Sequence, residues 1–148
     1  FYAEARRVLK PGGVCAAWGY GLMRVAPAID AVVDRFYSEV VGPYWPPERA
    51  HLDAGYRALG FPFPQIVAPV FAMEAEWPLE GLLGYLATWS AATRYATSTG
   101  NDPLAVIEAD LARAWGAADV PRRITWPLFL RVGRVAPSHS LPRDAREG

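Results

Sequence analysis

The segment RVLKPGGVCAAWGY, residues 7–20, constrains the fold of this chain more than any other. Residues 2–9 have helical spacing, Pro11 cannot continue that helix, and Gly12-Gly13 favours a turn. The apolar run Val14–Trp18 is too short for a helix and is bounded by glycines, so it predicts a β-strand. Because both of its sides are apolar, we expect a strand buried on both faces, as in a parallel sheet. Few residues precede it, so we expect the rest of that sheet to lie elsewhere.

The composition predicts one folded domain and excludes two classes of partner. Of the 148 residues, 52% are hydrophobic and 13% aromatic, which is enough to form a core. Fifteen basic residues balance fifteen acidic ones. Since no net field of either sign results, we expect neither nucleic acid nor an anionic membrane as a partner.

The content of cysteine and histidine argues against metal sites. Cys15 is the only cysteine, which excludes an internal disulfide and cysteine-rich zinc sites. His51 and His139 lack partners at ligand spacing, so no metal is expected. We find no secretory signal and no run of about 20 apolar residues that would span a membrane. A cytoplasmic location is therefore expected. Because Phe1 falls within a predicted helix, we expect a piece of a longer protein or a processed product.

The remaining elements follow from hydrophobic spacing and from helix start and stop signals. Helices are expected at 27–41, 46–59, 79–97 and 102–115, and extended segments at 66–77 and 122–135. Pro69 favours a bulge or a sheet edge. Asp102 before Pro103 is a typical helix start. The residues from 136 to 148 are rich in Pro, Ser, Arg and Asp, and we expect them to form a disordered tail.

Five stretches of the chain carry a resemblance to a known family. They are EARRVLKPGGVCAAWGY (4–20), SEVVGPYWPPER (38–49), GFPF (60–63), GYLATWSAATRY (84–95) and WPLFLRVGR (126–134). Together they resemble the C-terminal portion of class I S-adenosylmethionine-dependent methyltransferases. The match is to small-molecule enzymes similar to trans-aconitate methyltransferases, and it covers residues 1–135.

The resemblance implies an α/β, Rossmann-like fold. Val14–Trp18 would be strand five, 66–77 strand six and 122–135 strand seven, with strand seven antiparallel between the other two. Residues 26–62 would hold an inserted helical cap, and strands one to four would be missing. The exposed edge of strand five would then pair with another chain, so self-association is expected.

The resemblance also implies the function of a C-terminal methyltransferase fragment. S-adenosylmethionine would be the cofactor of the complete enzyme, and a small molecule would be the methyl acceptor. No cofactor-binding residue is expected here, because the cluster Gly12, Gly13, Gly19 and Gly21 does not precede a helix N-terminus. The chain alone would therefore be inactive. The alternative is a non-catalytic small-molecule-binding or oligomerisation module.

Six aromatic residues are candidates for binding the acceptor, with core packing as the alternative role of each. They are Trp18, Tyr20, Tyr44, Trp45, Tyr85 and Trp89. If the acceptor is a carboxylate, as the resemblance implies, Arg24 and Arg57 would pair with it. Glu48, Arg49 and Asp53 are typical of a solvated helix face. No nucleophile–base pair stands out, since Ser90 lacks the glycine-flanked elbow, so no catalytic residue is predicted.

Overall fold

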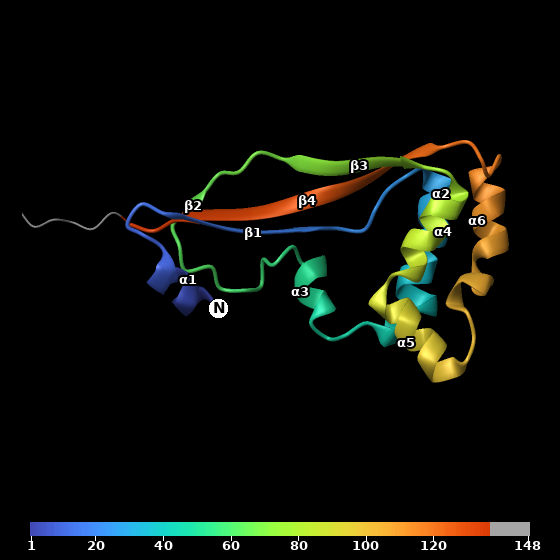
Figure 1. The fold of residues 1–148 in the computed structure, drawn as a ribbon, viewed down its shortest axis with the longest axis horizontal. Helices are drawn as coiled ribbons and strands as arrows, with labels where there is room; N and C mark the ends of the chain where they lie inside the picture. The colour runs from blue at the N-terminus through green and yellow to red at the C-terminus, as the bar shows by residue number, and fades with distance from the viewer. Residues whose placement is uncertain (137–148) are drawn as a thin grey trace, which may run out of the picture.

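The computed structural model describes residues 1–136 and contains a four-stranded antiparallel sheet. The strands are β1 (Val14–Tyr20), β2 (Gln65–Ile66), β3 (Phe71–Trp77) and β4 (Arg122–Arg134). The long strand β4 lies between β1 on one side and β2 and β3 on the other (Figure 1). All three predicted extended segments thus contain strands, and the segment 66–77 is divided into β2 and β3 by residues 67–70. Their identification with strands five, six and seven of the family sheet stays a prediction.

Most of the predicted helices are present, and several are shorter than expected. They are α1 (Tyr2–Val8), α2 (Pro27–Arg35), the π-helical η1 (Phe36–Val40), η2 (Gly42–Tyr44), α3 (Arg49–Asp53), α4 (Leu79–Ala87), α5 (Ser90–Thr99), η3 (Pro103–Val106) and α6 (Glu108–Trp115). The predicted cap at Asp102 is confirmed, because its carboxylate accepts a hydrogen bond of 2.9 Å from the Leu104 amide. No helix within residues 1–136 is long and apolar enough to cross a membrane.

The main core lies where the helices α2, α4, α5 and α6 pack together at one end of the sheet (Figure 1). It includes the fully buried residues Ile29, Phe36, Leu82, Leu86, Ile107, Leu111, Trp115 and Ile124. Ile124 comes from β4, so the sheet and the helical layer share this core. The sheet continues well beyond the helices, and its far part is covered more thinly.

The predicted helix 46–59 is wrong beyond α3. Gly55 and Tyr56 both have φ of 57°, a left-handed conformation that ends the helix. The predicted cap, residues 26–62, stays a prediction. Its first part, with Ile29 and Phe36, belongs to the main core, whereas its second part lies against β1 and β4.

The predicted continuous helix 79–97 is divided into α4 and α5. Trp89 is extended, with φ of −64° and ψ of 132°, and the Thr88 hydroxyl donates to the Tyr85 carbonyl at 2.7 Å. The Trp89 ring contacts Phe36 and Tyr37 at centroid distances of 5.7 and 5.8 Å. Tertiary packing of this ring therefore accompanies the break, which helical spacing alone does not reveal.

Strand β1 is buried on only one face in the described structure, so the prediction of burial on both faces is wrong here. Cys15 is buried, whereas 45% of Val14 and 65% of Trp18 are exposed. The covered face meets the aromatic side chains that follow α3: a side chain at Gly19 would overlap Phe129, whose ring packs on Tyr56. The predicted tail 136–148 lies outside the described residues, apart from Ala136.

Candidate functional site

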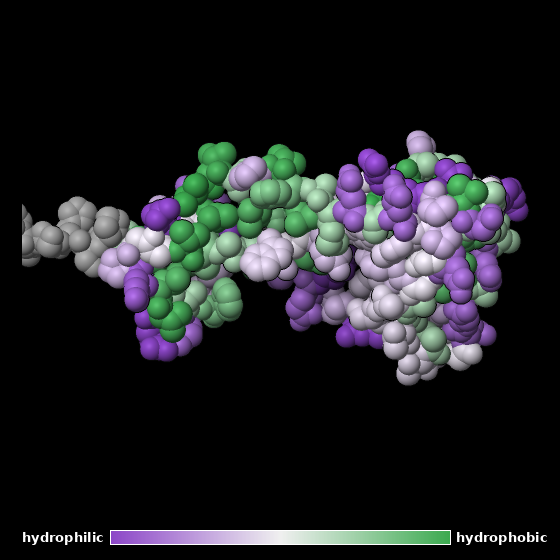
Figure 2. Space-filling model, turned by 45° about the horizontal axis from the view of Figure 1, so that its top comes forward, coloured by the Kyte–Doolittle hydropathy of each residue, from purple (hydrophilic) through white to green (hydrophobic). Residues whose placement is uncertain are grey.

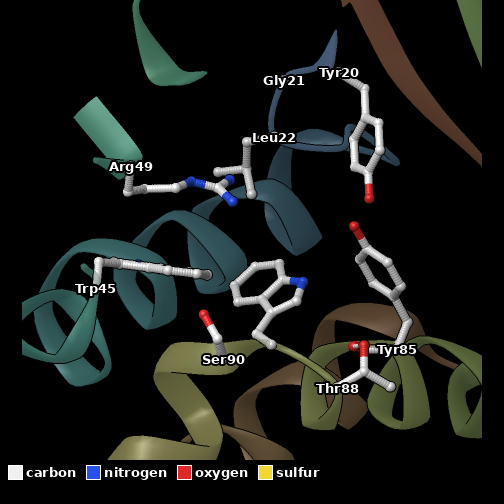
Figure 3. A pocket seen from close by; sticks show the side chains of 9 residues that line it. Tyr20, Gly21, Leu22, Trp45, Arg49, Tyr85, Thr88 and Ser90 are labelled. Carbon is white, nitrogen blue, oxygen red and sulfur yellow. Dashed lines mark hydrogen bonds between the residues drawn. The ribbon is translucent and has the colours of Figure 1, made fainter. Parts of the chain in front are cut away.

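A cavity of about 210 Å³ lies between the C-terminal end of β1, the segment around α3 and the break between α4 and α5 (Figure 3). Its lining comes from three regions that are distant in the sequence: Tyr20, Gly21 and Leu22; Trp45 and Arg49; and Tyr85, Thr88, Trp89 and Ser90. The break in the helix places Trp89 and Ser90 at this cavity. The departure from regular helix therefore helps to form the site.

Aromatic rings form the walls of the cavity. Trp89 lies between Trp45 and Tyr85, with ring centroids 5.6 and 6.0 Å apart. The Trp45 indole N–H donates to the Tyr37 carbonyl at 3.1 Å, and the Trp126 indole N–H donates to the Tyr85 hydroxyl at 3.1 Å. These hydrogen bonds fix the rings. The walls can therefore hold a small molecule with an apolar or planar body.

Arg49 brings a positive charge to the cavity. Its guanidinium carbon lies 4.5 Å from the centre of the Trp45 ring. Its Nε atom donates to the Tyr37 hydroxyl at 2.9 Å and to Oδ1 of Asp53 at 3.2 Å. These bonds use Nε, and the terminal nitrogens point toward Leu22 (Figure 3). A planar donor group held in this way matches a carboxylate.

Two of the phenols next to the cavity, Tyr37 and Tyr85, are neutral at physiological pH. Burial, followed by the hydrogen bond to Asp53, raises the pKa of Tyr37 to about 12. Burial also raises the pKa of Tyr85. The hydroxyls of Tyr20 and Tyr85 point toward each other across one end of the cavity (Figure 3). Neither a carboxylate nor a histidine is among the residues that line it. The cavity is therefore suited to binding and orienting rather than to acid–base catalysis.

The structure brings together four of the six predicted aromatic residues: Tyr20, Trp45, Tyr85 and Trp89. Tyr44 does not line the cavity and packs on Tyr95 at 5.1 Å. Trp18 does not line the cavity and borders a different groove. The cavity therefore contains neither Trp18 nor Tyr44.

The sequence missed the charged member of the site. We expected Arg49 on a solvated helix face, whereas its side chain is only 24% exposed. Its position four residues after Trp45, next to a short helix, was the available signal. Arg24, expected to pair with an acceptor, instead forms an ion pair of 2.7 Å with Asp34, and neither Arg24 nor Arg57 lines the cavity. Gly21, Leu22, Thr88 and Ser90 carried no distinguishing pattern.

The glycine turn before β1 does not fit the predicted cofactor. Gly12 and Gly13 form a turn closed by the Gly13 amide on the Lys10 carbonyl at 2.8 Å, and this turn leads into β1 rather than into a helix. Helix N-terminal amides for the cofactor are thus not supplied there. Within residues 1–136, no group of three or more metal-ligating side chains is gathered.

Comparison with known proteins relates the chain to methyltransferases. No protein-family model matches it. It is 29% identical over 140 residues to a Dictyostelium discoideum protein named "Putative methyltransferase", a match covering 90% of this chain and 53% of that protein. A solved structure, described as a "Putative Type II Methyltransferase" from Anaeromyxobacter dehalogenans, is 52% identical with a TM-score of 0.86. That match covers 93% of this chain and 58% of the other. The chain thus spans about half the length of the proteins it matches.

Proposed function

We propose that this chain, a relative of class I-like methyltransferases, is the C-terminal part of an S-adenosylmethionine-dependent methyltransferase of the cytoplasm that acts on a small molecule. In this proposal the chain supplies the acceptor pocket, and the cofactor-binding half lies outside the matched segment. The chain alone is then inactive. The observation that carries the proposal is a cavity with aromatic walls and one arginine, all from a segment 52% identical to a methyltransferase neighbour.

The role of the pocket is to bind and orient the acceptor. Methyl transfer is a displacement in which alignment of the reacting atoms supplies much of the rate. Trp45 and Trp89 would hold the body of the acceptor between their rings and exclude water from it. The hydroxyls of Tyr20 and Tyr85 would offer hydrogen bonds at one end.

Arg49 supports an acceptor that carries a carboxylate. Its guanidinium is stacked on Trp45 and held through Nε by Tyr37 and Asp53, so its direction is set before a ligand binds. A preorganised donor loses less conformational entropy when the complex forms. Arg49 therefore takes the role expected from the sequence for Arg24 and Arg57.

The experiment uses a chimera in which residues 1–148 replace the matched segment of the A. dehalogenans protein. Transfer of labelled methyl groups is measured for acceptors paired as a carboxylic acid and its neutral amide. We expect transfer to the acid, lost in Arg49→Met and kept in Arg94→Met, whose arginine is exposed on α5 away from the cavity. Equal transfer to acid and amide would reject the role of Arg49. Transfer by neither chimera nor chain to any acceptor would reject the methyltransferase proposal.

A binding module without catalysis is the second candidate. The observation that favours it is that three separate segments of this chain already come together to form the cavity. Quenching of tryptophan fluorescence by phenylacetate, used as a carboxylate probe, tests it on the chain alone. Binding by the chain, together with a chimera that transfers no methyl group, would favour this function over the first.

A further inference from the structure

Arg49 and Tyr85 lie at opposite ends of a row of aromatic contacts along the cavity. Arg49 stacks on Trp45, with its guanidinium carbon 4.5 Å from the centre of the ring. Trp45 packs on Trp89 at a centroid distance of 5.6 Å, and Trp89 packs on Tyr85 at 6.0 Å. The cavity therefore has a charged end at Arg49 and a phenol end, where Tyr20 faces Tyr85 (Figure 3).

Packing against the sheet fixes the position of the Tyr85 ring. The centre of this ring lies 5.7 Å from that of Trp77 and 5.5 Å from that of Trp126, a β4 residue that is only 3% exposed. The Trp126 indole N–H donates to the Tyr85 hydroxyl at 3.1 Å. Because an indole nitrogen can only donate, the Tyr85 oxygen is the acceptor in this bond.

The phenol pair presents a hydrogen-bond donor to the cavity. A phenol has a single O–H hydrogen, and the bond from Trp126 leaves that of Tyr85 unused. Burial raises the pKa of Tyr85, so its hydroxyl keeps this hydrogen at physiological pH. If Tyr85 donates to Tyr20, the hydrogen of Tyr20 takes its place. A ligand atom at this end therefore meets a donor in either arrangement and has to be an acceptor.

The phenol end offers no positive charge to a ligand. Among the residues that line the cavity, Arg49 alone is charged, and it belongs to the other end. Its Nε atom already lies 3.2 Å from a carboxylate oxygen of Asp53. An anionic group at the phenol end would therefore lose water without gaining a cation. A neutral oxygen, such as that of a carbonyl group, accepts the same hydrogen bond without this cost.

We infer that Tyr20 and Tyr85 determine the specificity of the cavity for a small carboxylic acid that carries a neutral, hydrogen-bond-accepting oxygen at the end opposite its carboxylate. The carboxylate pairs with Arg49, a planar body lies along Trp45 and Trp89, and the oxygen receives the donor of the phenol pair. The inference rests on the proposed function for the role of this ligand as methyl acceptor.

Isothermal titration of the chain of residues 1–148 with three para-substituted benzoates tests the inference. 4-Acetylbenzoate carries the neutral oxygen, 4-isopropenylbenzoate has the same shape without it, and terephthalate carries a second carboxylate. We expect 4-acetylbenzoate to bind about 2–12-fold more tightly than 4-isopropenylbenzoate, the range for one hydrogen bond between neutral groups. Terephthalate should bind more weakly than 4-acetylbenzoate, because its second charge finds no partner.

Phenylalanine variants separate the loss of a donor from damage to the pocket. Replacing both Tyr20 and Tyr85 by Phe should abolish the preference for 4-acetylbenzoate and leave the affinity for 4-isopropenylbenzoate unchanged, whereas damage would lower both affinities. If loss of the acceptor for Trp126 unfolds this variant, Tyr20→Phe alone should still reduce the preference. The matched control Tyr44→Phe should keep it, since Tyr44 packs on Tyr95 and does not line the cavity.

An apolar surface elsewhere on the molecule requires a control for the place of binding. Figure 2 shows hydrophobic residues gathered along the sheet beyond the helical layer. Trp18 and Met73 in β1 and β3 are 65% and 41% exposed, and aromatic probes would also adhere to such side chains. In Arg49→Met the affinities for 4-acetylbenzoate and 4-isopropenylbenzoate should fall by the same factor. Unchanged affinities in this variant would place the probes outside the cavity and overturn the inference.

The outcomes distinguish this inference from the proposed function. Equal binding of 4-acetylbenzoate and 4-isopropenylbenzoate, binding of neither, or a preference that survives loss of both hydroxyls would overturn the inference, even if the chimera transfers methyl groups. The predicted preference in a chain whose chimera transfers no methyl group would leave the specificity of the cavity standing and reject the proposed function instead.

Discussion

Two glycines of α4, Gly81 and Gly84, should respond differently to alanine, with only Gly84→Ala stabilising the chain. A side chain at Gly84 would meet no atom within 4 Å, so Gly84→Ala gains only helix propensity, about 1 kcal/mol. At Gly81 the new Cβ would lie 2.9 Å from the Trp77 Cβ atom. Trp77 cannot easily move away, because its ring packs on Tyr85 and Trp126 at 5.7 and 5.4 Å.

Overpacking of this kind typically costs about 1–3 kcal/mol, which offsets the propensity gain at Gly81 or exceeds it. The two variants should therefore differ by about 1–3 kcal/mol, equivalent to about 3–9 °C in Tm for a chain of this size. Denaturant and thermal unfolding followed by circular dichroism measure the difference. If Gly81→Ala stabilised the chain as much as Gly84→Ala, the close approach of Trp77 to α4, and with it the support of the Tyr85 wall, would be refuted.

Three further predictions concern the core, the pocket and a helix start. Leu86→Ala should lower the free energy of unfolding by about 2–5 kcal/mol in urea titrations, because Leu86 is fully buried. A decrease of less than about 2 kcal/mol would show that neighbouring side chains fill the cavity left by the substitution. Tyr37 should ionise near pH 12 when followed by absorbance, and its raised pKa means that its stabilising effect, complete below about pH 10, is lost as the pH rises toward 12. In Tyr37→Phe the decrease in stability between about pH 10 and pH 12 that comes from Tyr37 should disappear. An alkaline unfolding curve identical to that of the unsubstituted chain would contradict the raised pKa of Tyr37. Asp102→Ala should lower stability by about 0.5–2 kcal/mol through loss of the cap on the Leu104 amide, whereas Asp102→Asn should keep most of it.

The sequence correctly predicted the secondary-structure elements that depend on residues close together in the chain. Pro11 and Gly12-Gly13 correctly separated the first helix from β1, and the alternating pattern of 122–135 predicted β4 almost to its ends. Asp102 marked a helix start that the structure confirms. In each case the signal and its cause lie within a few residues of each other.

Errors arose where distant residues decide the local structure. The break at Trp89 accompanies contacts of its ring with Phe36, Tyr37 and Trp45, which lie more than forty residues earlier in the chain. Arg49 resembled a solvated side chain because its partner Tyr37 lies in a different helical segment. The aromatic composition of the site could thus be predicted, but its charge could not.

In strand β1 the sequence pattern and the structure of the described residues disagree about burial. Its apolar sequence predicted burial on both faces, whereas Val14 and Trp18 are exposed. Hydrophobic spacing reports the surroundings for which a strand is suited, and these can include a polypeptide outside the described residues.

Binding of S-adenosylhomocysteine, measured by isothermal titration of the chain alone and of the chimera, tests most directly whether this chain is one part of a methyltransferase. We predict no detectable heat of binding for the chain alone and micromolar binding for the chimera. Micromolar binding by residues 1–148 without the remainder would contradict the account.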